Sequence, residues 1–127
     1  MTEQNIKQSW FEFECWRRSL DFIRTENIFL KNRLALITKE QTSNTLLNEI
    51  ELFQAKLIGG EHNIVLLKSD IESLETWLKR EILSGTADYK EVLKSQKKLR
   101  KEIESAEHVF NKLKLEFNSF FSERLLD

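Results

Sequence analysis

Two histidines are the residues of this chain best suited to hold a metal ion. His62 and His108 occupy outward positions in the helical periodicity described below, with Glu61, Glu104 and Glu107 near them in the sequence. Imidazole and carboxylate groups are common zinc ligands. The sequence nevertheless has no Glu-x-x-His motif of the kind that binds paired iron ions in helical bundles, and no cluster of cysteine and histidine. It therefore predicts neither a metal site nor a bound cofactor.

The sequence also lacks the residues that usually carry out nucleophilic catalysis or bind phosphate groups. Cys15 is the only cysteine, and no histidine stands near it in the sequence to activate its thiol. The segment GGEHN, residues 59–63, matches neither glycine-rich signature of nucleotide-binding proteins. Carboxylates are spread along the chain rather than gathered into catalytic pairs. We therefore expect a protein that is not an enzyme.

The overall composition indicates a single helical domain spanning residues 1–127. Charged residues make up 32% of the chain and hydrophobic residues 40%, which is typical of a folded, soluble protein. There is no proline and there are only three glycines, so few residues oppose helix formation. The N-terminal residues lack the apolar core of a signal peptide, and no apolar stretch approaches the ~18 residues that cross a bilayer. We expect a cytoplasmic protein without a membrane partner.

Apolar residues recur at alternating steps of three and four in three long stretches of the chain. Residues with this spacing lie along one face of a helix, as in a coiled coil. The repeats predict helices at about 9–40, 43–83 and 88–125. The positions of the repeat, which we call the seam residues, are Phe13, Trp16, Leu20, Ile23, Asn27, Leu30, Leu34 and Ile37 in the first helix, Ile50, Phe53, Leu57, Gly60, Ile64, Leu67, Ile71, Leu74 and Leu78 in the second, and Tyr89, Val92, Gln96, Leu99, Ile103, Ala106, Phe110, Leu113, Phe117 and Phe120 in the third.

Polar residues indicate where these helices begin. Ser9 and Glu12 have the spacing of a capping box for the first helix, unless that helix begins earlier, at Thr2. Thr86 or Asp88 can cap the third helix. Only a few residues connect consecutive helices, so neighbours must run antiparallel. The sequence therefore predicts an all-α, antiparallel, up-down-up bundle of three long helices with coiled-coil-like packing.

The adjacent glycines Gly59 and Gly60, which we call the glycine pair, fall in the middle of the second predicted helix. Either they separate two shorter helices, giving four in all, or they lie within one continuous helix. The three-and-four spacing passes through Gly60 without a shift of phase, which favours one helix. Two glycines inside a helix cost ~2 kcal/mol relative to alanines. We expect bulky side chains of the neighbouring helices, near Phe22 and Phe110, to pack against the bare backbone and offset this cost.

The first helix carries a second apolar stripe beside its seam residues. Members of the stripe repeat every seven residues and lie ~100° around the helix from Trp16 and Ile23. The stripe either widens the face that packs inside the bundle or forms an interface with another molecule. We favour the interface, because exposed aromatic stripes are uncommon in small monomers. The apolar stripe consists of Cys15, Phe22, Phe29 and Leu36.

Polar residues beside the stripe belong to the same expected interface. Glu26 and Arg33 stand seven residues apart between the stripe and the seam. If a dimer buries them they must be paired, and pairing across a two-fold axis would set the register. Asn27 is a seam residue that can act in the same way, as single buried asparagines do in coiled coils. The alternative is a row of solvated charges.

Two further surfaces are candidates for binding. Trp10, Trp77 and Tyr89 fall near one end of the expected bundle, together with Phe13 and Trp16, as a core plug or as a pocket. The third helix also carries a run of basic residues that suits an acidic partner, although glutamates at helical spacing can neutralise it. This basic patch consists of Lys94, Lys97, Lys98, Arg100 and Lys101.

The sequence thus favours a non-enzymatic bundle that acts through protein–protein contact and forms a homodimer through the apolar stripe. A ligand- or metal-binding bundle, using the aromatic end or the two histidines, is one alternative. A binder of an anionic partner through the basic patch is another. A net charge of −1 gives the whole chain no general attraction for nucleic acid, which we do not expect as a partner.

Overall fold

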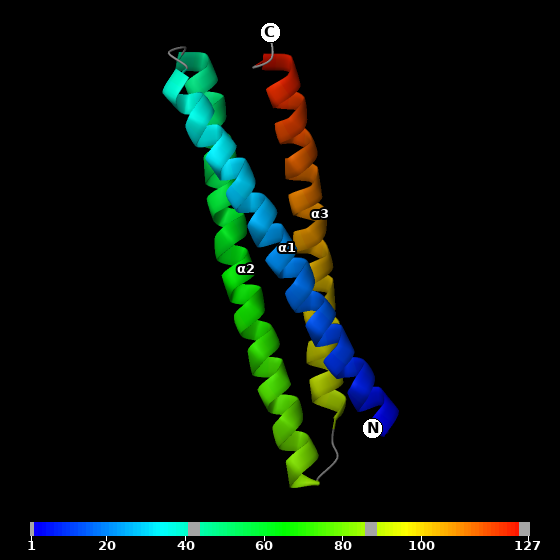
Figure 1. The fold of residues 1–127 in the computed structure, drawn as a ribbon. Helices are drawn as coiled ribbons and strands as arrows, with labels where there is room; N and C mark the ends of the chain where they lie inside the picture. The colour runs from blue at the N-terminus through cyan, green and yellow to red at the C-terminus, as the bar shows by residue number, and fades with distance from the viewer. Residues whose placement is uncertain (1, 41–43, 86–88, 125–127) are drawn as a thin grey trace.

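A computed structural model describes residues 2–40, 44–85 and 89–124 of the chain, which fold into three long α-helices. They are α1 (Glu3–Glu40), α2 (Asn44–Ser84) and α3 (Lys90–Arg124). The helices run up, down and up, so that consecutive helices are antiparallel (Figure 1). The predicted fold class is confirmed.

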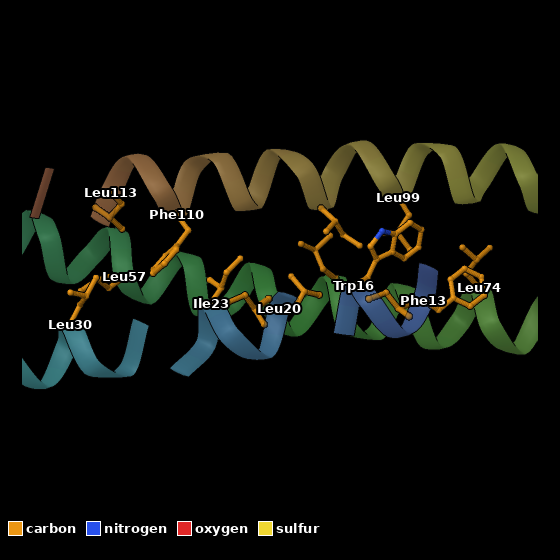
Figure 2. Close-up of a cluster of buried hydrophobic side chains, with 14 of the residues drawn as sticks. Phe13, Trp16, Leu20, Ile23, Leu30, Leu57, Leu74, Leu99, Phe110 and Leu113 are labelled. Atoms are coloured by element: carbon orange, nitrogen blue, oxygen red, sulfur yellow. The ribbon is translucent and has the colours of Figure 1, made fainter. Parts of the chain in front are cut away.

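Buried seam residues of all three helices form the hydrophobic core along the axis of the bundle. Figure 2 shows side chains reaching inward from all three helices, with Trp16 of α1 directed toward Leu99 of α3. Burial of a large apolar side chain contributes ~1.5–3 kcal/mol, so this core is the main source of stability. The large side chains that are 0% exposed are Phe13, Leu20, Leu34, Ile71, Leu78, Val92, Ile103 and Phe117.

Helix α1 begins at Glu3, earlier than the predicted start near Ser9. The hydroxyl of Thr2 accepts a hydrogen bond from the backbone N–H of Asn5 at 3.2 Å, as an N-cap does. The start at Thr2 that the sequence left open is therefore the one observed, and the capping box at Ser9 is wrong. The proposed caps of the third helix, Thr86 and Asp88, lie outside the described residues.

The glycine pair lies inside one continuous helix, so the alternative of four helices is wrong. Neither glycine has a positive φ; among the described residues only Gly85 does, at 66°, where it follows the end of α2. The expected packing of bulky side chains against the glycine pair is also wrong. A Cβ built on Gly59 or Gly60 would meet no atom of another residue within 4 Å. Ile23 of α1 and Phe110 of α3 lie at the height of the glycine pair, as predicted, but a hollow separates them from it.

Helix α2 is the central element of the bundle. Both α1 and α3 pack extensively against it, whereas contact between α1 and α3 is much smaller. In Figure 1, α1 crosses obliquely over the other two helices. The C-terminal part of α3 packs against α2, because the rings of Phe117 and Phe120 lie 5.8 and 5.1 Å from the ring of Phe53. Within the three described helices, no segment is both long and apolar enough to span a bilayer.

Replacing the glycine pair by alanine should stabilise the fold. Each substitution improves helix propensity by ~1 kcal/mol, and the added methyl group meets no neighbour. We expect Gly59→Ala and Gly60→Ala each to raise the free energy of unfolding in urea by ~1 kcal/mol. A loss of stability in either variant would show that other atoms pack tightly against the α2 backbone at this point.

Candidate functional site

The apolar stripe of α1 is exposed on the surface of the bundle. Phe22 is 60% exposed, Phe29 55% and Leu36 64%, while Cys15 is half-buried. The equally exposed Phe11 extends the stripe toward the N-terminus. The alternative in which these side chains widen the internal face is therefore wrong for Phe22, Phe29 and Leu36. The described helices α2 and α3 leave this face of α1 uncovered.

The charged residues beside the stripe find partners within the chain. Glu26 accepts a hydrogen bond from the ammonium group of Lys114 at 2.8 Å. The Arg33 guanidinium lies 4.1 Å from the ring centroid of Phe121, a cation–π contact. Both partners belong to α3, so Glu26 has a counter-ion without pairing across a two-fold axis, whereas Arg33 has an aromatic contact and no ion pair with another described residue. These contacts attach α1 to the C-terminal half of α3.

Asn27 sets register between α1 and α2. Its side chain is 1% exposed, and its amide donates a hydrogen bond to the backbone carbonyl of Leu57 at 2.7 Å. A buried amide without a partner would be unfavourable by ~1–3 kcal/mol, so a helical shift that breaks this bond is opposed. The sequence predicted a register role for Asn27, and the structure assigns that role to packing within one chain.

A polar network joins the N-terminal part of α1 to α3. Ser9 is 3% exposed and donates its hydroxyl hydrogen to the Gln96 amide oxygen at 3.1 Å. The Gln96 amide in turn donates to the Glu12 carboxylate at 2.7 Å. Arg100 donates to the same carboxylate through two nitrogens, at 2.7 and 2.8 Å. Ser9 and Glu12, predicted as a capping box, therefore act between helices. The sequence contained a signal for this role, because Ser9 lies four residues before Phe13 and so on the same helix face as the seam residues.

The Glu12–Arg100 pair is shifted toward its ionised form. Partial burial by itself would raise the pKa of the Glu12 carboxyl, but hydrogen bonds from Arg100 and Gln96 and the guanidinium charge together lower it. The hydrogen bond to Glu12 raises the pKa of Arg100, against a smaller opposing effect of burial. Both groups therefore remain charged at neutral pH. This pair is the strongest polar link between α1 and α3.

The lysines of the basic patch point into solvent on α3. Lys94, Lys97, Lys98 and Lys101 are all exposed, and none of the ion pairs in the described part of the chain includes them. Arg100 differs from these lysines, because it forms an ion pair with Glu12. The glutamates interleaved with the patch do not form ion pairs with these lysines. Four of the five residues of the basic patch, all of them lysines, are thus positive charges without an ion pair to another described residue.

A cleft of about 930 Å³ lies between α2 and α3 at the glycine pair. Ile23 and Asn27 of α1 contribute to its lining, together with the seam residues Ile64 and Phe110. A second hollow of about 510 Å³ continues it toward the C-terminal end of α3. Sequence reasoning placed Phe110 near the glycine pair but missed the cleft, because spacing along a helix does not reveal how far apart two helices lie.

The aromatic residues at the N-terminal end of α1 are mainly part of the core. Phe13 is 0% and Trp16 7% exposed, and the ring centroids of Trp10 and Phe13 lie 5.6 Å apart in an edge-to-face contact. Trp77 instead lies at the surface, where its indole donates to Glu81. This end of the bundle is therefore assigned to packing rather than to a pocket.

The two histidines are exposed on different helices. His62 belongs to α2, and His108 belongs to α3, where it lines the cleft. No group of three or more histidine, cysteine or acidic side chains suited to a metal ion gathers within residues 2–40, 44–85 and 89–124.

Comparisons of the chain with protein-family models, with curated proteins and with solved structures found no match. The function must therefore be inferred from the surfaces themselves. Three remain as candidates: the apolar stripe of α1, the basic patch of α3 and the cleft between α2 and α3.

Removing the Glu12 carboxylate should weaken the fold in a pH-dependent way. Glu12→Gln leaves Arg100 without its charged partner, and we expect a loss of ~1 kcal/mol at neutral pH, since the pair is partly exposed. The folded pKa of Glu12 is depressed, so its contribution is present above the unfolded pKa of ~4.3 and disappears as the pH falls through the folded value.

Urea unfolding of the wild type and Glu12→Gln, from about pH 7 down to about pH 3, measures this contribution. The difference in unfolding free energy should shrink below about pH 4. Glu14→Gln is the matched control, because Glu14 forms only an exposed pair with Arg18 and should change stability little at any pH. A Glu12→Gln difference that is constant across the range would contradict the assignment.

Proposed function

We propose that this protein acts through protein–protein contact and self-associates as a homodimer through the apolar stripe of α1. The observation that carries the proposal is the exposure of Phe22, Phe29 and Leu36 along one face of a single helix. Transfer of such apolar surface out of water is favourable by ~25 cal/mol per Å². A second copy of the same helix offers a surface of matching length and chemistry.

The dimensions of the stripe suit a helix–helix contact. From Phe11 to Leu36 it extends ~38 Å along α1, at 1.5 Å per residue. Cys15, Phe22, Phe29 and Leu36 repeat every seven residues, which is the period of helices that pack as coiled coils. Glu26 and Arg33, at the edge of this surface, already have partners on α3. A dimer that covers Glu26 therefore buries a carboxylate that is already paired with Lys114, which lowers the cost of burying that charge.

Replacing two members of the stripe by a small polar residue should abolish self-association. The wild type should sediment at about twice the monomer mass of 15.2 kDa at tens of micromolar. Phe22→Ser combined with Phe29→Ser should sediment at the monomer mass and retain its helical circular dichroism, because both side chains are exposed in the single chain. Analytical ultracentrifugation distinguishes the two states.

A matched control removes equally exposed apolar side chains from α2. Ile58 is 44% and Val65 65% exposed, and both lie outside the stripe. The double variant Ile58→Ser, Val65→Ser should dimerise as the wild type does. A wild type that is strictly monomeric at this concentration would refute self-association. A dimer that is lost equally in both double variants would refute the assignment to α1.

Binding of an acidic partner through the basic patch is a second candidate function. Four exposed lysines without ion pairs favour it over the neutralised surface that the interleaved glutamates suggested. Such an interaction would be dominated by charge, and its strength would fall as salt is added. We infer an acidic protein segment as the partner, because the chain as a whole has no excess of positive charge.

A fluorescent poly-glutamate peptide tests this second candidate. We expect binding at low ionic strength that weakens steeply between about 50 and 300 mM salt. Substituting Lys94, Lys97 and Lys98 by glutamine should remove most of the binding. Lys7→Gln with Lys39→Gln, at the two ends of α1, should have little effect. Equal losses in both variants would indicate non-specific attraction, and binding of RNA but not of the peptide would also overturn the proposal.

A further inference from the structure

We propose that the cleft between α2 and α3 binds a small molecule with an apolar body and an anionic group. The cleft has a volume of about 930 Å³, within the ~300–1,000 Å³ typical of pockets for small ligands. Its walls are residues of α2 and α3, and α1 contributes Ile23 and Asn27. No member of the apolar stripe lines it, so this inference stands apart from the proposed dimer.

The cleft is open because the seam is interrupted at one level of the bundle. Gly60 occupies a seam position of α2 where leucine or isoleucine stands before and after it, and Ala106 occupies a seam position of α3. A helix bundle normally fills such positions with large side chains. The two small residues line the same cleft together with the second glycine, Gly59.

The fold has no need for the glycine pair. Both glycines have helical conformations, and a Cβ on either would meet no atom of another helix within 4 Å. They weaken α2 by ~2 kcal/mol relative to alanines, without improving any contact within the chain. Their physical consequence is a stretch of bare helix backbone exposed to the cleft. A ligand lying against that backbone would gain the contacts that the missing side chains do not make.

The lining of the cleft determines which chemistry it would accept. Val109, which is 61% exposed, offers the ligand apolar contact, and the seam residues Ile64, Phe110 and Leu113, which are 3–7% exposed, add smaller apolar surfaces to the lining. A flat or branched apolar group would bury these surfaces. Purely polar molecules such as free sugars would gain little there.

Positive charge at the rim favours an anionic group on the ligand. Lys56 forms an ion pair with Glu116 at 3.7 Å, and both line the cleft. Lys101 and Lys112 also line the cleft, and neither forms an ion pair with another described residue. Among the carboxylates that line it, Glu102 also lacks an ion pair with a described residue, whereas Glu116 is paired with Lys56. The unpaired groups thus leave an excess of one positive charge. A carboxylate or sulfonate would complement it.

The probe for this proposal is 8-anilinonaphthalene-1-sulfonate, which combines an aromatic body with a sulfonate and fluoresces strongly in apolar surroundings. We expect saturable binding with one probe per chain. Gly60→Leu, which places a side chain in the cleft, should weaken binding by about tenfold or more. Gly59→Leu provides a second test, because Gly59 is exposed and its substitution leaves the core intact. Circular dichroism verifies that each variant is folded.

Charge substitutions test the anionic part of the inference. Lys101→Gln with Lys112→Gln should weaken sulfonate binding several-fold and leave binding of the neutral analogue N-phenyl-1-naphthylamine unchanged. Lys94→Gln with Lys97→Gln is the matched control, because it removes the same charge from α3 outside the cleft. Unchanged affinity for the sulfonate in both glycine variants would overturn the cleft as its site. Loss of binding in the Phe22→Ser, Phe29→Ser variant alone would assign the probe to the apolar stripe instead.

Discussion

Burial of the seam residues along a common axis is the interaction on which this structure depends. The outer side of each helix carries many charged residues that remain in water. Each helix therefore packs against the others mainly through its apolar face. In proteins most of the stability of a helix comes from the packing of its amphipathic face, so each helix requires the others. Because α2 contacts both neighbours extensively, the core is organised around it, and α1 and α3 are joined to each other mainly by polar and cation–π contacts.

Polar contacts then select one register among the many that an apolar seam permits. Apolar side chains repeat every few residues, so a shift of one heptad would restore most hydrophobic contacts. A buried amide or hydroxyl has no such freedom, because it must meet a specific partner. Asn27 provides this restriction between α1 and α2, and the network of Ser9, Gln96, Glu12 and Arg100 provides it between α1 and α3.

The same two helix pairings explain where the surface is open. Attachment of α1 by one seam leaves the stripe on its outer side uncovered, since a helix in a three-helix bundle buries only one broad face. The small residues Gly60 and Ala106 leave a hollow where α2 and α3 pass one another. The stripe therefore suits a large partner that presents another helix. The cleft suits a compact molecule, because its volume of about 930 Å³ is in the range of small-ligand pockets.

The sequence by itself determined the elements of this protein, because helix formation and amphipathic spacing are local properties. It predicted three helices, their antiparallel order, the continuity of α2 through the glycine pair and most of the buried residues. It also identified Phe22, Phe29 and Leu36 as surplus apolar surface, because they lie away from the seam.

Only the tertiary structure decided which polar groups meet and where the helices separate. Ser9 and Glu12 have the spacing of a helix cap, and nothing local distinguishes a cap from a contact with α3. Glu26 and Arg33 likewise acquire their partners from a helix more than eighty residues away in the chain. The open space at Gly60 depends on the distance between two helix axes. That distance is set by packing over the whole length of the bundle, and no local spacing rule contains it.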